Sequence, residues 1–171
     1  KSRFLMLGTP NQGSYEAVRW LTGNNATQAK LSLLDLTQNT DEIANLVRRY
    51  PGLLELLPFD PESKDFTQLN LWADLKEQLS AAWLPPETLD LINIRETWSL
   101  LKNSTLSVDP KYTCYVAGCQ DATVVDYRLV DCGGLLHAHS NCKRFEFLAT
   151  REGDGTVSWK SGRLPDVPLW Y

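Results

Sequence analysis

The stretch RFLMLGTPNQGS, residues 3–14, gives the clearest indication of the fold. Residues 3–7 form a short apolar run that ends at Gly8, which is typical of a buried strand. The residues that follow are rich in turn formers, and Ser14 is placed to cap a helix that Gly23 would end. Because a strand that turns directly into a helix is the repeating unit of an α/β sheet, this stretch predicts an α/β fold.

Residues 26–110 have a different pattern, in which every strong signal is helical. Apolar residues recur at helical spacing over 41–50, 71–83 and 87–102, and prolines separate these segments. Their tryptophans and leucines are expected to form plain core, with the lining of an acyl-chain tunnel as the alternative. The block is interpreted as a helical subdomain inserted between the strands of a sheet.

Strand-like segments return after this block, at 112–117, 123–130 and 144–150, where β-branched and aromatic residues are frequent. The last twenty residues are predicted to be mostly loop. The chain is therefore divided into a sheet strand, loop and helix at 1–25, the helical insertion at 26–110, and further sheet strands at 111–171.

The composition of the 171 residues is that of an ordinary globular protein, with 43% hydrophobic and 22% charged residues. The net charge of -4 comes without a basic cluster, which argues against a nucleic-acid partner. No apolar stretch reaches the roughly 18 to 20 residues that a membrane-spanning helix needs. The first residue is Lys1 rather than Met, so we expect a piece of a longer or processed protein.

Cysteine usage leaves several states open. The four cysteines are too few for a disulfide scaffold, which favours a cytoplasmic location over the others. Cys132 and Cys142 enclose His137 and His139, a combination that can bind zinc, although the spacing is irregular for a structural zinc site. A disulfide between Cys132 and Cys142 is a second alternative. Free thiols, with no metal bound, are the preferred interpretation.

Three stretches together resemble one family. Residues 4–14 resemble the strand and loop that follow the nucleophile helix in lipase-like α/β-hydrolases. Residues 51–58, PGLLELLP, resemble a cap segment of the lecithin:cholesterol acyltransferase-like branch, and residues 152–157, EGDGTV, resemble its acid-bearing loop. The order and spacing of the stretches match across almost the whole chain. The resemblance implies a partial α/β-hydrolase sheet with an inserted helical cap at 26–110.

By this resemblance Asp154 is the acid of a Ser-His-Asp triad. Gly153 and Gly155 on either side allow the tight loop and close approach that such an acid needs. The alternative is a simple Asp-Gly turn, and Asp121 is kept as a reserve candidate for the acid. Thr9, Pro10 and Gly13 are expected to shape the loop beside the cleft.

The pattern lacks two of the three triad members. In this fold the order is Ser, acid, His, with the Ser in G-x-S-x-G, and that motif is absent from the sequence. Both histidines precede Asp154. We therefore expect the serine upstream of Lys1 and the histidine downstream of Tyr171, in the remainder of the hydrolase domain, and no hydrolysis by this segment alone.

The function implied by the resemblance is hydrolysis or transfer of an acyl ester, or lipid-like substrate, through a serine acyl-enzyme and without a cofactor. The cap leucines are the predicted substrate contacts, namely Leu53, Leu54, Leu56 and Leu57. The alternative is a non-catalytic interaction or regulatory module of hydrolase descent. The natural ester and the choice between hydrolysis and transfer are not predicted.

Overall fold

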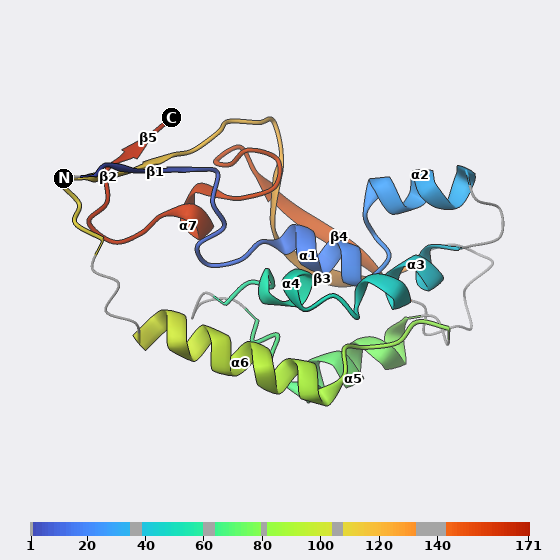
Figure 1. The fold of residues 1–171 in the computed structure, drawn as a ribbon. Helices are drawn as coiled ribbons and strands as arrows, with labels where there is room; N and C mark the ends of the chain where they lie inside the picture. The colour runs from blue at the N-terminus through green and yellow to red at the C-terminus, as the bar shows by residue number, and fades with distance from the viewer. Residues whose placement is uncertain (1, 35–38, 60–63, 80–81, 104–107, 133–142) are drawn as a thin grey trace.

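The computed structural model describes residues 2–171 except for 35–38, 60–63, 80–81, 104–107 and 133–142. Helices and strands are mixed, and most of the helices lie together in the middle of the chain (Figure 1). In chain order the elements are β1 (Phe4–Leu7), α1 (Tyr15–Leu21), α2 (Ala26–Leu34), α3 (Thr40–Val47), α4 (Pro51–Glu55), α5 (Leu69–Gln78), α6 (Thr88–Asn103), β2 (Thr113–Val116), β3 (Thr123–Asp131), β4 (Lys143–Thr150), α7 (Trp159–Gly162) and β5 (Leu169–Trp170).

The strands form two separate sheets. β1, β2 and β5 make a small parallel sheet in the order β1-β2-β5, with Phe4 opposite Thr113 and Tyr115 opposite Leu169. β3 and β4 make an antiparallel hairpin of their own. Within the described residues β3 and β4 thus pair with each other and are not hydrogen-bonded to the parallel sheet.

Local sequence signals explain where the helices begin. The Ser14 hydroxyl accepts a hydrogen bond from the backbone N–H of Glu16 at 3.1 Å, so its predicted capping role is confirmed. Asn39 and Glu42 form a reciprocal capping box at the start of α3. Pro51 occupies the first turn of α4, where its missing N–H leaves no helical hydrogen bond unmade.

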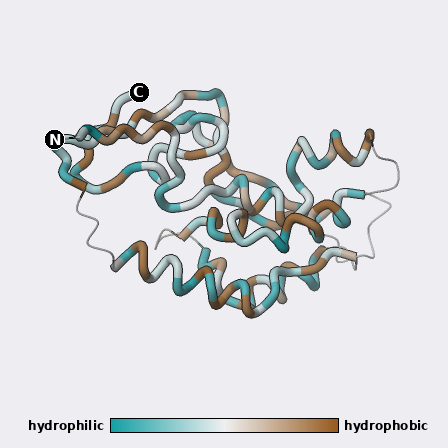
Figure 2. The backbone as a smooth tube through the Cα atoms, viewed as in Figure 1, coloured by the Kyte–Doolittle hydropathy of each residue, from teal (hydrophilic) through white to brown (hydrophobic). Residues whose placement is uncertain are grey.

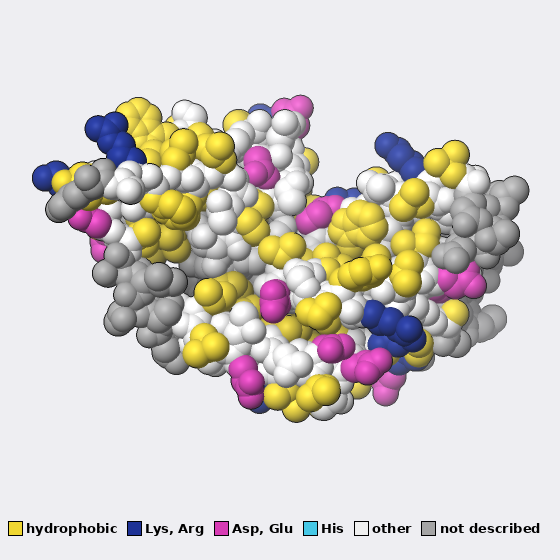
Figure 3. All heavy atoms as spheres, in the orientation of Figure 1, with side chains coloured by type: hydrophobic (Ala, Val, Ile, Leu, Met, Phe, Trp, Pro, Cys, Tyr) yellow, Lys and Arg dark blue, Asp and Glu magenta, His cyan; other side chains and the backbone are white. Residues whose placement is uncertain are grey.

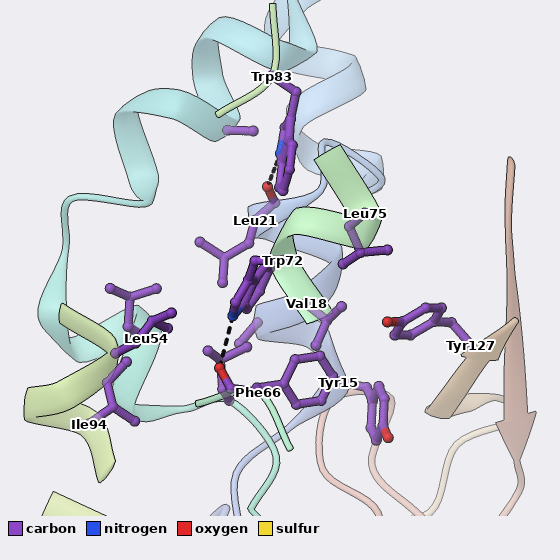
Figure 4. Packing of buried hydrophobic residues seen from close by; sticks show 14 of the residues in the cluster. Tyr15, Val18, Leu21, Leu54, Phe66, Trp72, Leu75, Trp83, Ile94 and Tyr127 are labelled. Atoms are coloured by element: carbon purple, nitrogen blue, oxygen red, sulfur yellow. Dashed lines mark hydrogen bonds between the residues drawn. The ribbon is translucent and has the colours of Figure 1, made fainter. Parts of the chain in front are cut away.

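Most buried apolar residues lie in one main core, which joins α1, α3, α4, α5 and α6 to the hairpin β3–β4. Trp72 and Trp83 are almost fully buried there, and their rings stack with centroids 6.4 Å apart. Their indole N–H groups donate to the carbonyls of Phe66 at 2.8 Å and of Leu21 at 2.7 Å (Figure 4). The predicted structural role of these tryptophans is confirmed, because every buried polar atom of their side chains has a partner.

A small core lies under one face of the parallel sheet. Met6, Tyr115, Ala117 and Val167 form it, with Trp159 of α7 packed against them. The opposite face is apolar but uncovered within the described structure: Leu5 is 57% exposed and Leu7 is 67% exposed. The prediction of a buried strand at residues 3–7 is therefore right about the strand and wrong about its burial.

Hydrophobic side chains gather on the surface at this end of the molecule. Figure 2 shows hydrophobic residues running along β1 and β2, and Figure 3 shows yellow side chains clustered at the upper left, over the parallel sheet. Trp170 of β5, 65% exposed, belongs to the same end. Two short elements in the region predicted as loop, α7 and β5, complete this part of the fold.

Candidate functional site

The three stretches that carry the family resemblance meet in space. The loop after β1 lies against the acid-bearing loop, because a Cβ built on Gly8 would lie 2.7 Å from Oδ2 of Asp154. The same loop also lies against the segment after α4, because the backbone N–H of Ser14 donates to the carbonyl of Leu56 at 2.7 Å. The Ser14 hydroxyl in turn donates to the carbonyl of Thr156. Segments far apart in the sequence thus build one junction.

Asp154 lies where two parallel strands end. Gly8 directly follows β1, and Gly118 comes shortly after β2. A Cβ on Gly118 would lie 2.7 Å from Cβ of Asp154, so this close approach requires glycine, and the φ of +54° at Gly8 favours glycine there as well. The carboxyl ends of parallel strands are the edge at which α/β proteins place their sites. The half-buried Asp154 is therefore at the edge where a catalytic group would be expected.

The two carboxylate oxygens of Asp154 have different surroundings. Oδ1 accepts from the backbone N–H of Thr156 at 2.8 Å and of Val157 at 2.6 Å, which fixes the turn. The turn is braced by the N–H of Gly155, which donates to the hydroxyl of Thr123 at 2.8 Å. Oδ2 has no hydrogen-bond donor within the part of the chain that the structure describes. Oδ1 therefore holds the loop, and Oδ2 is left to accept from another group.

Tyr115 of β2 lies beneath this carboxylate, in the small core. Burial raises the pKa of its hydroxyl, and the negative charge of Asp154 raises it further. A Cβ on Gly162 of α7 would overlap the Tyr115 hydroxyl, so α7 packs directly on the ring. Tyr115 thus positions α7, which follows the acid-bearing loop.

The predicted cleft loop is brought to this junction. Thr9 and Pro10 are half-buried, and the side chain of the neighbouring Asn11 donates to the carbonyl of Gly162 at 2.5 Å. Gly13 has φ of +79°, and a Cβ there would lie 2.2 Å from the carbonyl oxygen of Leu57. Both facts exclude a side chain at this position.

The four predicted substrate contacts are not equivalent. Leu54 and Leu57 are almost completely buried in the main core, whereas Leu53 is partly buried and Leu56 is 40% exposed. Only Leu53 and Leu56 could therefore touch a substrate without opening the core. The role of all four stays a prediction.

A pocket of about 460 Å³ lies beside the acid-bearing loop, and sequence reasoning missed it. Glu152 and Thr156 of that loop line it, together with Tyr15, Lys64 and Asp126. These last three come from α1, from the segment before α5 and from β3, so no local motif unites them. In the sequence Asp126 is one charged residue within a predicted strand, and nothing nearby marks it as part of a pocket.

The remaining sequence candidates are one further carboxylate and the cysteines and histidines. Asp121, the reserve acid, is exposed on a bend before β3. Cys132 is disulfide-bonded, so the free-thiol interpretation is wrong for it, while Cys114 and Cys119 are free. A disulfide is typical of oxidising compartments, which removes the basis for expecting a cytoplasmic location. Cys142, His137 and His139 lie outside the described residues.

Neither a membrane span nor a metal centre is found in the described part of the chain: no helix there is long and apolar enough to cross a bilayer, and no three metal-binding side chains cluster. Compared with family models, curated proteins and solved structures, the chain gives no significant match.

Proposed function

We propose that this chain supplies the acid and the cap of a serine hydrolase or acyltransferase of the α/β-hydrolase type, acting on acyl esters. In this proposal Asp154 orients a histidine and stabilises its imidazolium form. The histidine and the nucleophilic serine belong to segments outside these 171 residues. The serine attacks the ester carbonyl, the ester C–O bond breaks and the alcohol leaves with a proton from the histidine. The resulting acyl-enzyme is then cleaved by water or by an acceptor alcohol, which regenerates the serine.

One observation carries the proposal: Asp154 is packed with its carboxylate against Gly8 and its Cβ against Gly118, just after the ends of two adjacent parallel strands. A simple surface turn would not need glycine at two positions so distant in the chain. The loop fixes one oxygen and leaves Oδ2 for a donor, which is the arrangement that a histidine N–H requires.

The parallel sheet gives a second line of support. Parallel sheets are normally covered on both faces, yet Leu5 and Leu7 are exposed on one face. β1 is also an edge strand among the described residues, with β2 on one side only. A further parallel strand beside β1, followed by a helix over Leu5 and Leu7, would complete the sheet. A strand-to-helix turn is also what the nucleophile elbow of this fold provides.

The test uses the protein with its flanking sequence, labelled with a fluorophosphonate probe that reacts with activated serines. Asp154→Asn should slow labelling by about 10³- to 10⁴-fold, the order of effect expected when a triad acid is lost. Asp74→Asn is the matched control, because Asp74 is an exposed carboxylate of α5, which belongs to the helical part of the chain. Its labelling rate should equal that of the wild type.

Equal labelling of both variants would contradict the role of Asp154. No labelling of the wild-type protein at all would instead favour a non-catalytic interaction module, for which the uncovered sheet face is the supporting observation.

The predicted substrate contacts need a separate test. Asp substitutions at Leu54 or Leu57 would unfold the main core, so Leu56→Ala is the informative change. It should alter the preference for acyl-chain length in the full protein. Leu89→Ala, at an exposed leucine of α6, is the control and should leave that preference unchanged.

A further inference from the structure

The pocket beside the acid-bearing loop is built by segments that converge from four parts of the chain. Gln12 comes from the loop after β1, Pro58 from the segment after α4, Thr150 from the end of β4, and Ser161 from α7. Its volume of about 460 Å³ lies within the range of small-molecule sites, roughly 300 to 1,000 Å³. Asp154 is not part of its lining, so the pocket is distinct from the proposed catalytic carboxylate.

A β-bulge gives the pocket its wall. Val124 pairs with Ala149 and Asp126 pairs with Leu148, so Val125 is an extra residue on β3. In a regular strand consecutive side chains alternate between faces, whereas a bulge re-aims them. As a result Val124, Val125 and Asp126 all line the pocket.

Two oppositely charged side chains of the pocket lining neutralise one another. The Asp126 carboxylate contacts the Lys64 ammonium, and burial together with the charge of Asp126 raises the pKa of the neighbouring Tyr15 hydroxyl. The same ammonium donates to the carbonyl of Tyr127 at 3.1 Å and lies 4.5 Å from the centroid of its ring. Asp126 and Lys64 therefore offer a ligand both an acceptor and a donor, but no excess charge.

The other residues that line the pocket also carry equal numbers of positive and negative charges. Glu152 and Lys160 are exposed side chains of opposite sign, and hydroxyl groups come from Ser14, Thr150, Thr156, Ser158 and Ser161. An anion would meet two carboxylates, and a cation would meet two ammonium groups. Apolar atoms of Pro58, Val124 and Val125 complete the wall.

From this lining we infer that the pocket binds a neutral, hydroxyl-rich small molecule of the monosaccharide type. Hydroxyl groups both donate and accept, so they pair with each member of the lining, and the C–H face of a sugar ring packs on the valines. The inference does not depend on the proposed catalytic role of Asp154.

Three probes of nearly equal shape test it on the 171-residue chain: methyl β-glucopyranoside, glucuronate and glucosamine, which are neutral, anionic and cationic. Saturation-transfer NMR titration should give saturable binding, with the neutral glycoside at least about threefold tighter than either charged probe. Absence of saturable binding of the glycoside, or preference for a charged probe, would overturn the inference.

Two variants on β3 locate the site. Val125→Trp should fill the pocket and weaken glycoside binding at least about tenfold, whereas Val130→Trp, at a half-buried valine outside the pocket lining, should not weaken it. Equal binding by the two variants would count against this pocket.

If Val125→Trp does not fold, Asp126→Asn provides a second test of the site. It removes one negative charge from the pocket lining and so makes the lining more positive, and preference should shift about tenfold toward glucuronate. A structural role alone would weaken all three probes together, and that result would also overturn the inference.

Discussion

The main core and the parallel sheet differ in how far their apolar residues are buried. Trp72 in the main core is 1% exposed and its indole N–H is paired, whereas Trp170 at the sheet is 65% exposed. The helices and the hairpin enclose their own hydrophobic cluster, but the sheet covers only one of its faces. The comparison shows that the main core buries its large aromatic residues, whereas one face of the parallel sheet is uncovered within the described residues.

The two tryptophans give the largest expected difference. Trp72→Ala should lower the free energy of unfolding by roughly 3 to 5 kcal/mol, because it opens a cavity and leaves the Phe66 carbonyl without its donor. Trp170→Ala should change it by about 0.5 kcal/mol or less, as is usual for an exposed site. Urea denaturation of both variants measures the contrast, and equal losses would show that the sheet is as tightly packed as the main core.

The junction between the two regions can be broken at Gly13. Gly13→Ala should lower the free energy of unfolding for two reasons. The positive φ alone costs roughly 1 to 3 kcal/mol of backbone strain, and the added methyl group would also overlap the Leu57 carbonyl, so the total loss should be larger. Gly23→Ala is the matched control: φ there is +72°, but the added methyl meets Thr40 only at 3.5 Å or more. Thermal unfolding should show a clearly larger loss for Gly13→Ala, and a similar loss for both would mean that the junction has room to relax.

Alkaline pH should weaken the main core through Tyr127. Burial, and secondly the charge of Asp126, raise the pKa of Tyr127 from 10.0 to about 12. Between these values the unfolded chain loses the proton and the folded chain keeps it, so stability falls as pH rises. The loss should be roughly 2 kcal/mol across that interval. Tyr127→Phe should show a shallower fall in urea denaturation at pH 10 to 12, and an unchanged slope would rule out this cause.

The smallest expected effect on stability is at the uncovered sheet face. Leu7→Glu should leave the unfolding temperature of this chain unchanged while reducing its self-association, because it breaks an exposed apolar patch. Leu33→Glu, at an equally exposed leucine of α2, should leave self-association as it is. Sedimentation velocity would separate the two, and an equal effect would mean that the sheet face is no more adhesive than the rest of the surface.

Local pattern predicted the helices and long strands well, because each depends on neighbours in the sequence. The capping by Ser14 and the helical spacing around Trp72 and Trp98 are examples. The two-residue strand β5 was missed, since it exists only through pairing with β2. The burial of β1 was mispredicted for a similar reason: an apolar run shows that a strand can be buried, not what covers it.

The candidate site likewise has one part that the sequence predicts and one part that it does not. Asp154 could be selected from the sequence, because glycines on both sides mark a tight loop. Its contact with Gly8 and Gly118 depends on the parallel pairing of β1 and β2, which no short motif encodes. The pocket was out of reach, since the bulge at Val125 and the meeting of Tyr15, Lys64 and Asp126 arise only in the folded chain.

The pairing of Phe4 with Thr113 also has a consequence for synthesis on the ribosome. β1 is translated before all of the helices α1 to α6, yet its hydrogen-bonding partner emerges only after them. A nascent chain must therefore carry an apolar strand without its neighbour while the helices fold, and contacts of such long sequence separation form slowly. Chaperones that bind short hydrophobic segments would find the edge of β1 that pairs with β2 accessible throughout that interval.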